Sequence, residues 1–197
     1  AYRQGILVSN PLDRVDPPKQ FPAHQTFYNP DQLARLLDLV EGNSLELPVK
    51  LAGYLGLRRS EITGLRWCDV DLARGMLSIR QIRTAAGHKI VCKAPKTTGS
   101  MRTLEISCIQ DLTDLLERQL QAHRKLMESR GLPWREDLCV VIDTEGKPWH
   151  PNRLTGAFAT FIASRGLPKV TLHGLRHTFA SVANDARVPM YQIIRTL

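Results

Sequence analysis

A histidine and an arginine lie three positions apart in the segment HGLRHTFAS, residues 173–181. Residues with this spacing share one face of a helix, so His173 and Arg176 would point in the same direction. A guanidinium presents a planar fork of donors that matches a phosphate, and a neighbouring imidazole can bind the same anion or move a proton. The pair predicts an anion site, although a surface helix with scattered polar residues would have the same pattern.

Two further segments carry cations in positions that could face an anion. In GLRRSEITGLRW, residues 56–67, Arg58 and Arg59 lie at a junction between helices, beside Ser60 as the expected helix cap. A helix N-terminus favours anions, whereas the alternative is an exposed arginine pair bridged to Glu61. In KAPKTTGSMRTLEI, Lys96 lies in a loop between predicted strands, from which a lysine can reach into a groove or simply face solvent.

Taken together and in this order, the three segments resemble the catalytic domain of the tyrosine recombinases, the phage integrase family. That family carries G-L-R-x-S-E-x-x-G-L-x-W, then a lysine on a β-hairpin, then H-x-L-R-H-T. The resemblance covers essentially the whole chain, and it implies a site-specific DNA recombinase of a phage or mobile element. Matched residue by residue, it assigns the catalytic positions to four side chains: Arg58, Lys96, His173 and Arg176.

The resemblance also implies a mechanism that needs no metal and no cofactor. A tyrosine hydroxyl attacks a DNA phosphodiester and leaves a 3′-phosphotyrosyl link and a free 5′-hydroxyl. Arg58 and Arg176 would stabilise the negative charge of the transition state, and Lys96 would donate a proton to the leaving 5′-oxygen. His173 would assist proton transfer from the tyrosine or bond a phosphate oxygen. We assign structural roles to three other motif residues, Glu61, Trp67 and His177, and none to Arg59 at a variable position.

The nucleophilic tyrosine of the family pattern has no match in these residues. In the family it follows an L-G-H motif, whereas this sequence stops at IIRTL. Tyr191, 15 residues after Arg176, comes too early to match. We therefore expect the catalytic domain, residues 28–197, to be truncated before its tyrosine and unable to cleave DNA alone. A catalytically inactive, truncated integrase that only binds DNA is the alternative.

Two other readings of the motifs are weaker. A type IB topoisomerase would share the chemistry, but the H-x-L-R-H-T segment matches recombinases better. His173 and His177, one helical turn apart, could ligate a metal, but neither an HExxH motif nor a plausible third ligand accompanies them.

The charge distribution favours a polyanionic partner. The chain of 197 residues has a net charge of +8, yet residues 72–104 and 146–197 each hold seven Lys or Arg, and the rest is net negative. Double-stranded DNA is the expected partner, bound by a homotetramer of the full-length protein as the resemblance implies. Beyond the catalytic cations, the residues expected to contact DNA are Arg80, Arg83, Lys93, Arg102 and Lys169.

Hydrophobic periodicity and turn residues predict an α+β fold, mainly helical, with a small antiparallel three-stranded sheet. This is the DNA breaking-rejoining fold that the resemblance implies. Residues 1–27, with four prolines, are expected to be a linker from an absent N-terminal core-binding domain. The four cysteines are expected to be reduced and mostly buried, in a cytoplasmic protein of a bacterium or phage without a membrane span. The expected helices cover residues 30–41, 45–57, 60–65, 109–130, 151–164 and 172–186, with one more from Pro189, and the expected strands cover 76–83, 89–93 and 102–106.

Overall fold

The computed structural model describes residue 5 and residues 7–10, 14–16, 27–87, 89–95 and 101–187. Lys96, Tyr191 and the helix expected from Pro189 lie outside the described residues. The same holds for most of the segment predicted to be a linker, residues 1–27.

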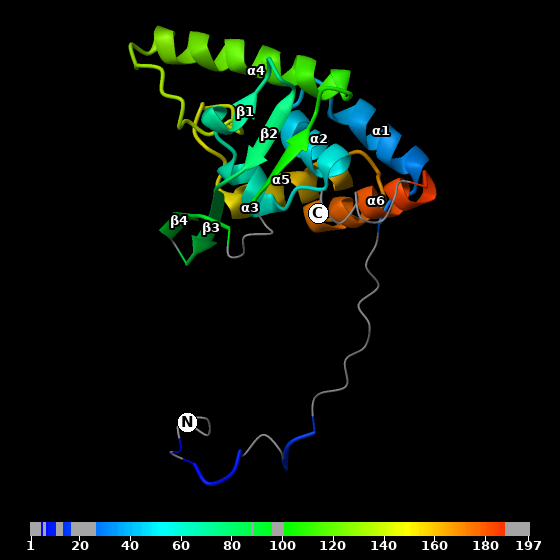
Figure 1. The fold of residues 1–197 in the computed structure, drawn as a ribbon. Coiled ribbons are helices and arrows are strands. Elements are labelled where there is room, and N and C mark those ends of the chain that lie inside the picture. Colours follow the sequence, from blue (N-terminus) through cyan, green and yellow to red (C-terminus); the bar gives the residue numbers. More distant parts are fainter. Residues whose placement is uncertain are drawn as a thin grey trace.

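Among the described residues, six α-helices and one short 3-10 helix hold far more of the chain than the strands do (Figure 1), which confirms the predicted mainly helical fold. The helix predicted over 60–65 begins one residue earlier, because Arg58 rather than Ser60 occupies the N-cap position. The elements are α1 (Pro30–Val40), α2 (Glu46–Leu55), α3 (Arg59–Gly64), η3 (Trp67–Asp69), α4 (Gln110–Ser129), α5 (Pro151–Ser164) and α6 (Leu172–Asp185).

Side-chain caps fix where two of these helices begin. Asn29 accepts a hydrogen bond from the backbone N–H of Gln32, and the Gln32 side chain accepts one from Asn29 in return, before Pro30 opens α1. Thr171 accepts a hydrogen bond from the backbone N–H of Gly174 at 2.9 Å. This cap sets the start of α6 at Leu172, one residue before His173.

The strands form two small antiparallel sheets rather than one. β1 (Val70–Asp71), β2 (Met76–Ile79) and β5 (Arg102–Glu105) form a three-stranded sheet in the order β1-β2-β5. β3 (Ile82–Ala86) and β4 (Lys89–Lys93) form a separate hairpin, which projects from the rest of the fold in Figure 1. The predicted strand over 76–83 is therefore wrong as a single unit. The third strand of the sheet comes instead from β1, in a segment where no strand was predicted.

Close packing against α3 explains why the chain leaves the first sheet after β2. A Cβ on Gly64 would lie 2.8 Å from the backbone nitrogen of Arg83 and 2.8 Å from the carbonyl oxygen of Gln81. The hydroxyl of Thr63 also donates to the Arg83 carbonyl oxygen at 3.1 Å. The absence of a side chain at Gly64 thus lets the root of the hairpin pack directly on α3.

The core is built around α2, which packs against α1, α3, α4 and α6. Nearly all of α2 is buried, and only Tyr54 is partly exposed. A helix that is buried on all sides normally carries apolar residues alone, yet α2 contains Lys50, 1% exposed, and Glu46, 8% exposed. Burial of these charges requires partners.

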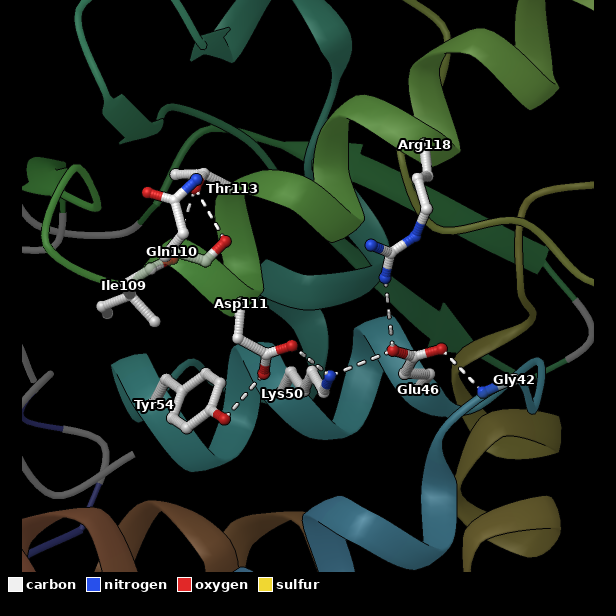
Figure 2. Close-up of polar contacts among 9 residues, drawn as sticks. All are labelled: Gly42, Glu46, Lys50, Tyr54, Ile109, Gln110, Asp111, Thr113 and Arg118. Carbon is white, nitrogen blue, oxygen red and sulfur yellow. Dashed lines mark hydrogen bonds and ion pairs between the residues drawn. The ribbon is translucent and has the colours of Figure 1, made fainter.

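Those partners form what we call the Lys50 cluster, which links α2 to α4 (Figure 2). The Lys50 ammonium donates to Asp111 at 2.7 Å and to Glu46 at 3.0 Å. The Tyr54 hydroxyl donates to the second Asp111 oxygen at 2.8 Å, and Arg118 lies 3.9 Å from Glu46. Burial raises the pKa of Tyr54, and the neighbouring Asp111 raises it further.

Residues 138–142 form isolated bridges rather than a named strand, and Val140 and Val141 among them are buried. The Val140 N–H donates to the Leu65 carbonyl at 2.9 Å, and the Trp67 N–H donates to the Leu138 carbonyl at 3.1 Å. Trp67 is buried, and its indole N–H donates to His123 at 3.0 Å, which confirms its structural role.

The four cysteines are free, as predicted, but the expectation that they are mostly buried is wrong. Cys68, Cys92 and Cys108 are exposed, and Cys139 is half-buried. Cys92 is exposed because nothing in the described chain covers that face of the two-stranded hairpin. No helix among the described residues combines the length and apolar character that crossing a membrane requires.

Candidate active site

Arg58 lies at the N-cap of α3, where Glu61 holds it in two ways. The backbone N–H of Arg58 donates to one Glu61 oxygen at 2.9 Å, and its guanidinium donates to the other at 2.9 Å. The Arg58 side chain nevertheless remains 44% exposed. The two sequence interpretations of this segment therefore both apply, because the residue forms an ion pair and still presents donors to solvent.

Glu61 is 2% exposed and also receives the guanidinium of Arg102 from β5. Two parallel hydrogen bonds, of 3.1 and 3.0 Å, join Arg102 to the two Glu61 oxygens. Burial alone would raise the pKa of Glu61, but the hydrogen bonds and charge of Arg102, with Arg58, outweigh it and lower the pKa. Glu61 is therefore a buried carboxylate that orients two arginines, which confirms the structural role predicted for it.

Arg176 reaches the same region from α6 and is 8% exposed. Its guanidinium donates to the carbonyl oxygen of Gly56 at 2.6 Å. Gly56 ends α2 in the left-handed conformation, with a φ of 60°, which favours glycine at that position. Burial, and then the positive charge of Arg58, lower the pKa of Arg176 to about 10, so it stays charged at neutral pH.

His173 lies on the exposed side of α6, one helical turn before the half-buried His177. Burial lowers the pKa of His173, and the charges of His177, Arg176 and Arg58 lower it further. His173 therefore lies within the electrostatic field of both arginines. The fold thus brings together three of the four predicted catalytic residues, from the start of α3 and from α6.

This arrangement can bind and polarise an oxyanion. The guanidiniums of Arg58 and Arg102 contact the Glu61 carboxylate, and the charge of Glu61 also acts on Arg176. The imidazole of His173 lies within the field of Arg58 and Arg176. Rigid donors held in this way stabilise negative charge that develops on a phosphate in a transition state. Among the described residues, no three His, Cys, Asp or Glu side chains gather as a metal site would require.

The residues predicted to bind DNA fall into two groups. Arg80, Lys93 and Lys169 are exposed and available to a ligand. Arg83 and Arg102 are engaged with the protein, since the Arg83 guanidinium donates to the Trp149 carbonyl at 2.5 Å and Arg102 binds Glu61. A contact of any of these residues with DNA stays a prediction.

Two features of the site had no clear sequence signal. The carbonyl of Gly56 binds Arg176 across 120 residues, and a backbone acceptor cannot be recognised from residue types. The pairing of Arg102 with Glu61 across 41 residues could have been suspected only from the acid inside the arginine-containing segment.

A family model described as the phage integrase family matches residues 26–197. The chain belongs to the phage integrase family. The match includes all three segments from which the site was predicted. Membership in the family confirms the resemblance inferred from the motifs.

Curated relatives of this integrase-family chain have similar names. It is 22% identical to a "Tyrosine recombinase XerC-like" protein of Caldanaerobacter subterraneus subsp. tengcongensis, over all of this chain and 54% of that protein. It is 25% identical to the ICEBs1 integrase of Bacillus subtilis over 92% of this chain and 49% of that protein. Prophage integrase IntR of Escherichia coli is 27% identical over 91% of this chain and 46% of its own length. The chain thus spans about half the length of the curated relatives it matches.

Solved structures confirm the fold. The Tn1549 transposon integrase in complex with transposon right end DNA matches with a TM-score of 0.76 and 20% identity, over 98% of this chain and 65% of that one. A lambda integrase dimer bound to a COC′ core site matches with a TM-score of 0.61 and 16% identity, over all of this chain and 65% of that one. At these identities the likeness concerns the fold, which is that of the integrase catalytic domains.

Proposed function

We propose that this chain is the catalytic domain of a site-specific DNA recombinase that cleaves and rejoins DNA through a 3′-phosphotyrosyl intermediate. The observation that carries the proposal is the convergence of Arg58 and Arg176 near the buried Glu61, with His173 within the field of both arginines. These residue types and this arrangement suit a phosphodiester whose charge increases during the reaction.

The surroundings of Arg58, Arg176 and His173 support a role for each of them, whereas the role of Lys96 rests on the family pattern. Arg58, exposed and held by Glu61, and Arg176, held by the Gly56 carbonyl, bind the non-bridging phosphate oxygens in the transition state. His173 exchanges a proton with the attacking hydroxyl or binds a phosphate oxygen. Lys96 donates a proton to the leaving 5′-oxygen. The nucleophile is a tyrosine hydroxyl, as the family pattern implies.

The wider assignments are part of the same proposal. Residues 1–27 are the linker from a core-binding domain, and residues 28–197 are the catalytic domain. The substrate is double-stranded DNA, and the working assembly is a homotetramer in a bacterial or phage-infected cytoplasm. In support, the Tn1549 integrase was solved with transposon right end DNA and the lambda integrase dimer with a COC′ core site. The names of the relatives, all recombinases or integrases, support an enzyme over a protein that only binds DNA.

Arg58 and its neighbour Arg59 offer a matched test. Arg59 also begins α3, but it points to α5, where it donates to Thr155 at 2.9 Å. We expect Arg58→Ala in the full-length protein to lower DNA cleavage by at least about 100-fold, with DNA binding kept within about fivefold. Arg59→Ala should retain cleavage within about threefold.

The assay uses a nicked duplex with the end sequence of the DNA element that encodes the protein, so that the cleaved strand remains covalently attached. Gel electrophoresis measures the covalent complex, and a mobility shift measures binding. Circular dichroism checks that both variants fold. Equal loss of cleavage in both variants, or normal cleavage by Arg58→Ala, would contradict the proposed role of Arg58.

A further inference from the structure

α6 holds the imidazoles of His173 and His177 against each other. Their Nε2 atoms lie 3.2 Å apart, at hydrogen-bond distance. The ring centroids are 4.8 Å apart and the ring planes are nearly perpendicular, at 88°. Because a hydrogen bond needs one donor and one acceptor, one Nε2 carries a proton and the other presents a lone pair.

The direction of this hydrogen bond determines what His173 offers at its other nitrogen. If His177 donates, a neutral His173 carries its own proton on Nδ1 and is a donor there. If His173 donates, its Nδ1 has a free lone pair and is a base. A single proton, shared between the two Nε2 atoms, therefore sets the chemistry available at Nδ1 of His173.

We propose that His177 is a positioning residue that holds His173 by the Nε2–Nε2 hydrogen bond and controls whether its Nδ1 accepts or donates a proton. This inference rests on the proposed function, since it deepens the role of His173 in it. When the hydroxyl attacks, its O–H bond breaks and a new N–H bond forms at Nδ1 of His173. The Nε2 proton of His173 passes to Nε2 of His177. His173 stays neutral, and the positive charge resides on His177. In the reverse reaction the two protons return.

The charges around His173 favour such a relay. Within the described chain, the charged groups that act on His173 are His177 and Arg176 from α6 and Arg58 from the start of α3. Burial and then these positive charges lower the pKa of His173, so a proton held on this imidazole is disfavoured. Transfer to the half-buried His177 removes the charge from His173.

Two variants of His177 separate this role from a purely structural one. His177→Phe keeps a ring but has no nitrogen, whereas a glutamine at this position, His177→Gln, can still hydrogen-bond Nε2 of His173 but carries no charge. We expect His177→Phe to lower the maximal cleavage rate of the full-length protein about tenfold. His177→Gln keeps the hydrogen bond but cannot accept the proton, so we expect it to recover only part of this loss and to stay about fivefold below wild type. In both variants the acid limb of the pH–rate profile should move to higher pH, because loss of the His177 charge raises the pKa of His173.

An NMR titration without DNA tests the coupling independently of cleavage. In protein with ¹⁵N-labelled histidine, we expect the His173 imidazole to titrate at higher pH in both variants than in wild type. Identical His173 titrations in wild type and His177→Gln would overturn the inference, as would an unchanged acid limb. Failure of the wild-type protein to cleave DNA would instead refute the proposed function, while the titration would still report on the histidine pair. If circular dichroism shows that His177→Phe does not fold, the titration and the pH–rate profile of His177→Gln test the inference.

Discussion

The Lys50 cluster differs from what we call the Glu61 cluster, formed by Glu61, Arg58, Arg102 and Arg176, in the balance of its charges. In the first, two carboxylates, those of Glu46 and Asp111, face two cations, Lys50 and Arg118. In the second, one carboxylate faces three guanidiniums. Both clusters include buried groups, so their charges interact strongly.

This difference separates a structural cluster from a functional one. A balanced cluster satisfies its charges within the protein and joins α2 to α4. A cluster with excess positive charge retains electrostatic free energy that a bound anion can release. We therefore expect a bound phosphate to stabilise the Glu61 cluster more than the Lys50 cluster.

Removal of the single carboxylate of the Glu61 cluster should have the largest effect. Glu61→Gln leaves the guanidiniums without their buried counter-charge, so we expect the free energy of unfolding to fall by about 3 kcal/mol. Urea denaturation measures the change, and exposed Glu105→Gln on β5 is the control. Added sulfate should stabilise Glu61→Gln more than wild type. An equal response of the two proteins would contradict the interpretation of excess charge.

Disruption of the Lys50 cluster should cost less and leave chemistry intact. Lys50→Met fills the space but leaves Glu46 and Asp111 without their shared cation. Because the Asp111 side chain is 44% exposed and can regain water, we expect a loss of about 2 kcal/mol. Cleavage per folded molecule should stay within about threefold of wild type. A cleavage loss as large as that of Arg58→Ala would show that the two clusters are not functionally separate.

Acid titration should distinguish the two clusters further. The pKa values of Glu61 and Asp111 are lowered in the fold, so their stabilisation is complete above the ordinary values of 4.5 and 3.8 and is lost as pH falls through the folded values. One such carboxyl changes the unfolding free energy by at most about 1.4 kcal/mol per pH unit. Unfolding measured between pH 5 and pH 2 should show a smaller slope in Glu61→Gln and in Asp111→Asn than in wild type. An unchanged slope in either variant would show that the carboxyl replaced there does not contribute to the pH dependence of stability.

The smallest effect is expected for the exposed cations outside both clusters. Lys93→Ala and Lys169→Ala should each weaken DNA binding about threefold at low salt, because each removes one phosphate contact. The slope of log K against log salt should decrease by about one in each case. Fluorescence anisotropy over a range of salt concentrations measures both quantities. An unchanged slope would mean that the lysine does not contact the DNA backbone.

Local signals predicted the helices well, and long-range pairing accounts for most of what they missed. Asn29 and Pro30 set the start of α1, and Pro151 begins α5, as their residue types predict. The observed sheets differ from the predicted one because tertiary packing determines which strands pair. Gln81 and Arg83 lie against Gly64, and this contact ends β2 in a way that alternation of residues could not reveal.

The candidate site shows the same division. Arg58, His173 and Arg176 were found because their motifs are short and specific, and the fold brings them together. Arg102 was assigned to DNA from its charge alone, whereas its Glu61 partner lies 41 residues away. The burial of Lys50 had no local sequence signal, because its partner Asp111 lies 61 residues away on a different helix.

The contact between Gly64 and the hairpin root has a mechanical consequence. α3 begins next to Arg58 and ends at Gly64, where the backbone of Gln81 and Arg83 is too close to admit even a methyl group. The hairpin is thus anchored on the same short helix whose N-cap is Arg58. A displacement of the outer part of the hairpin would therefore also move α3. The hairpin can bend without moving Arg58 only in the residues that follow Arg83.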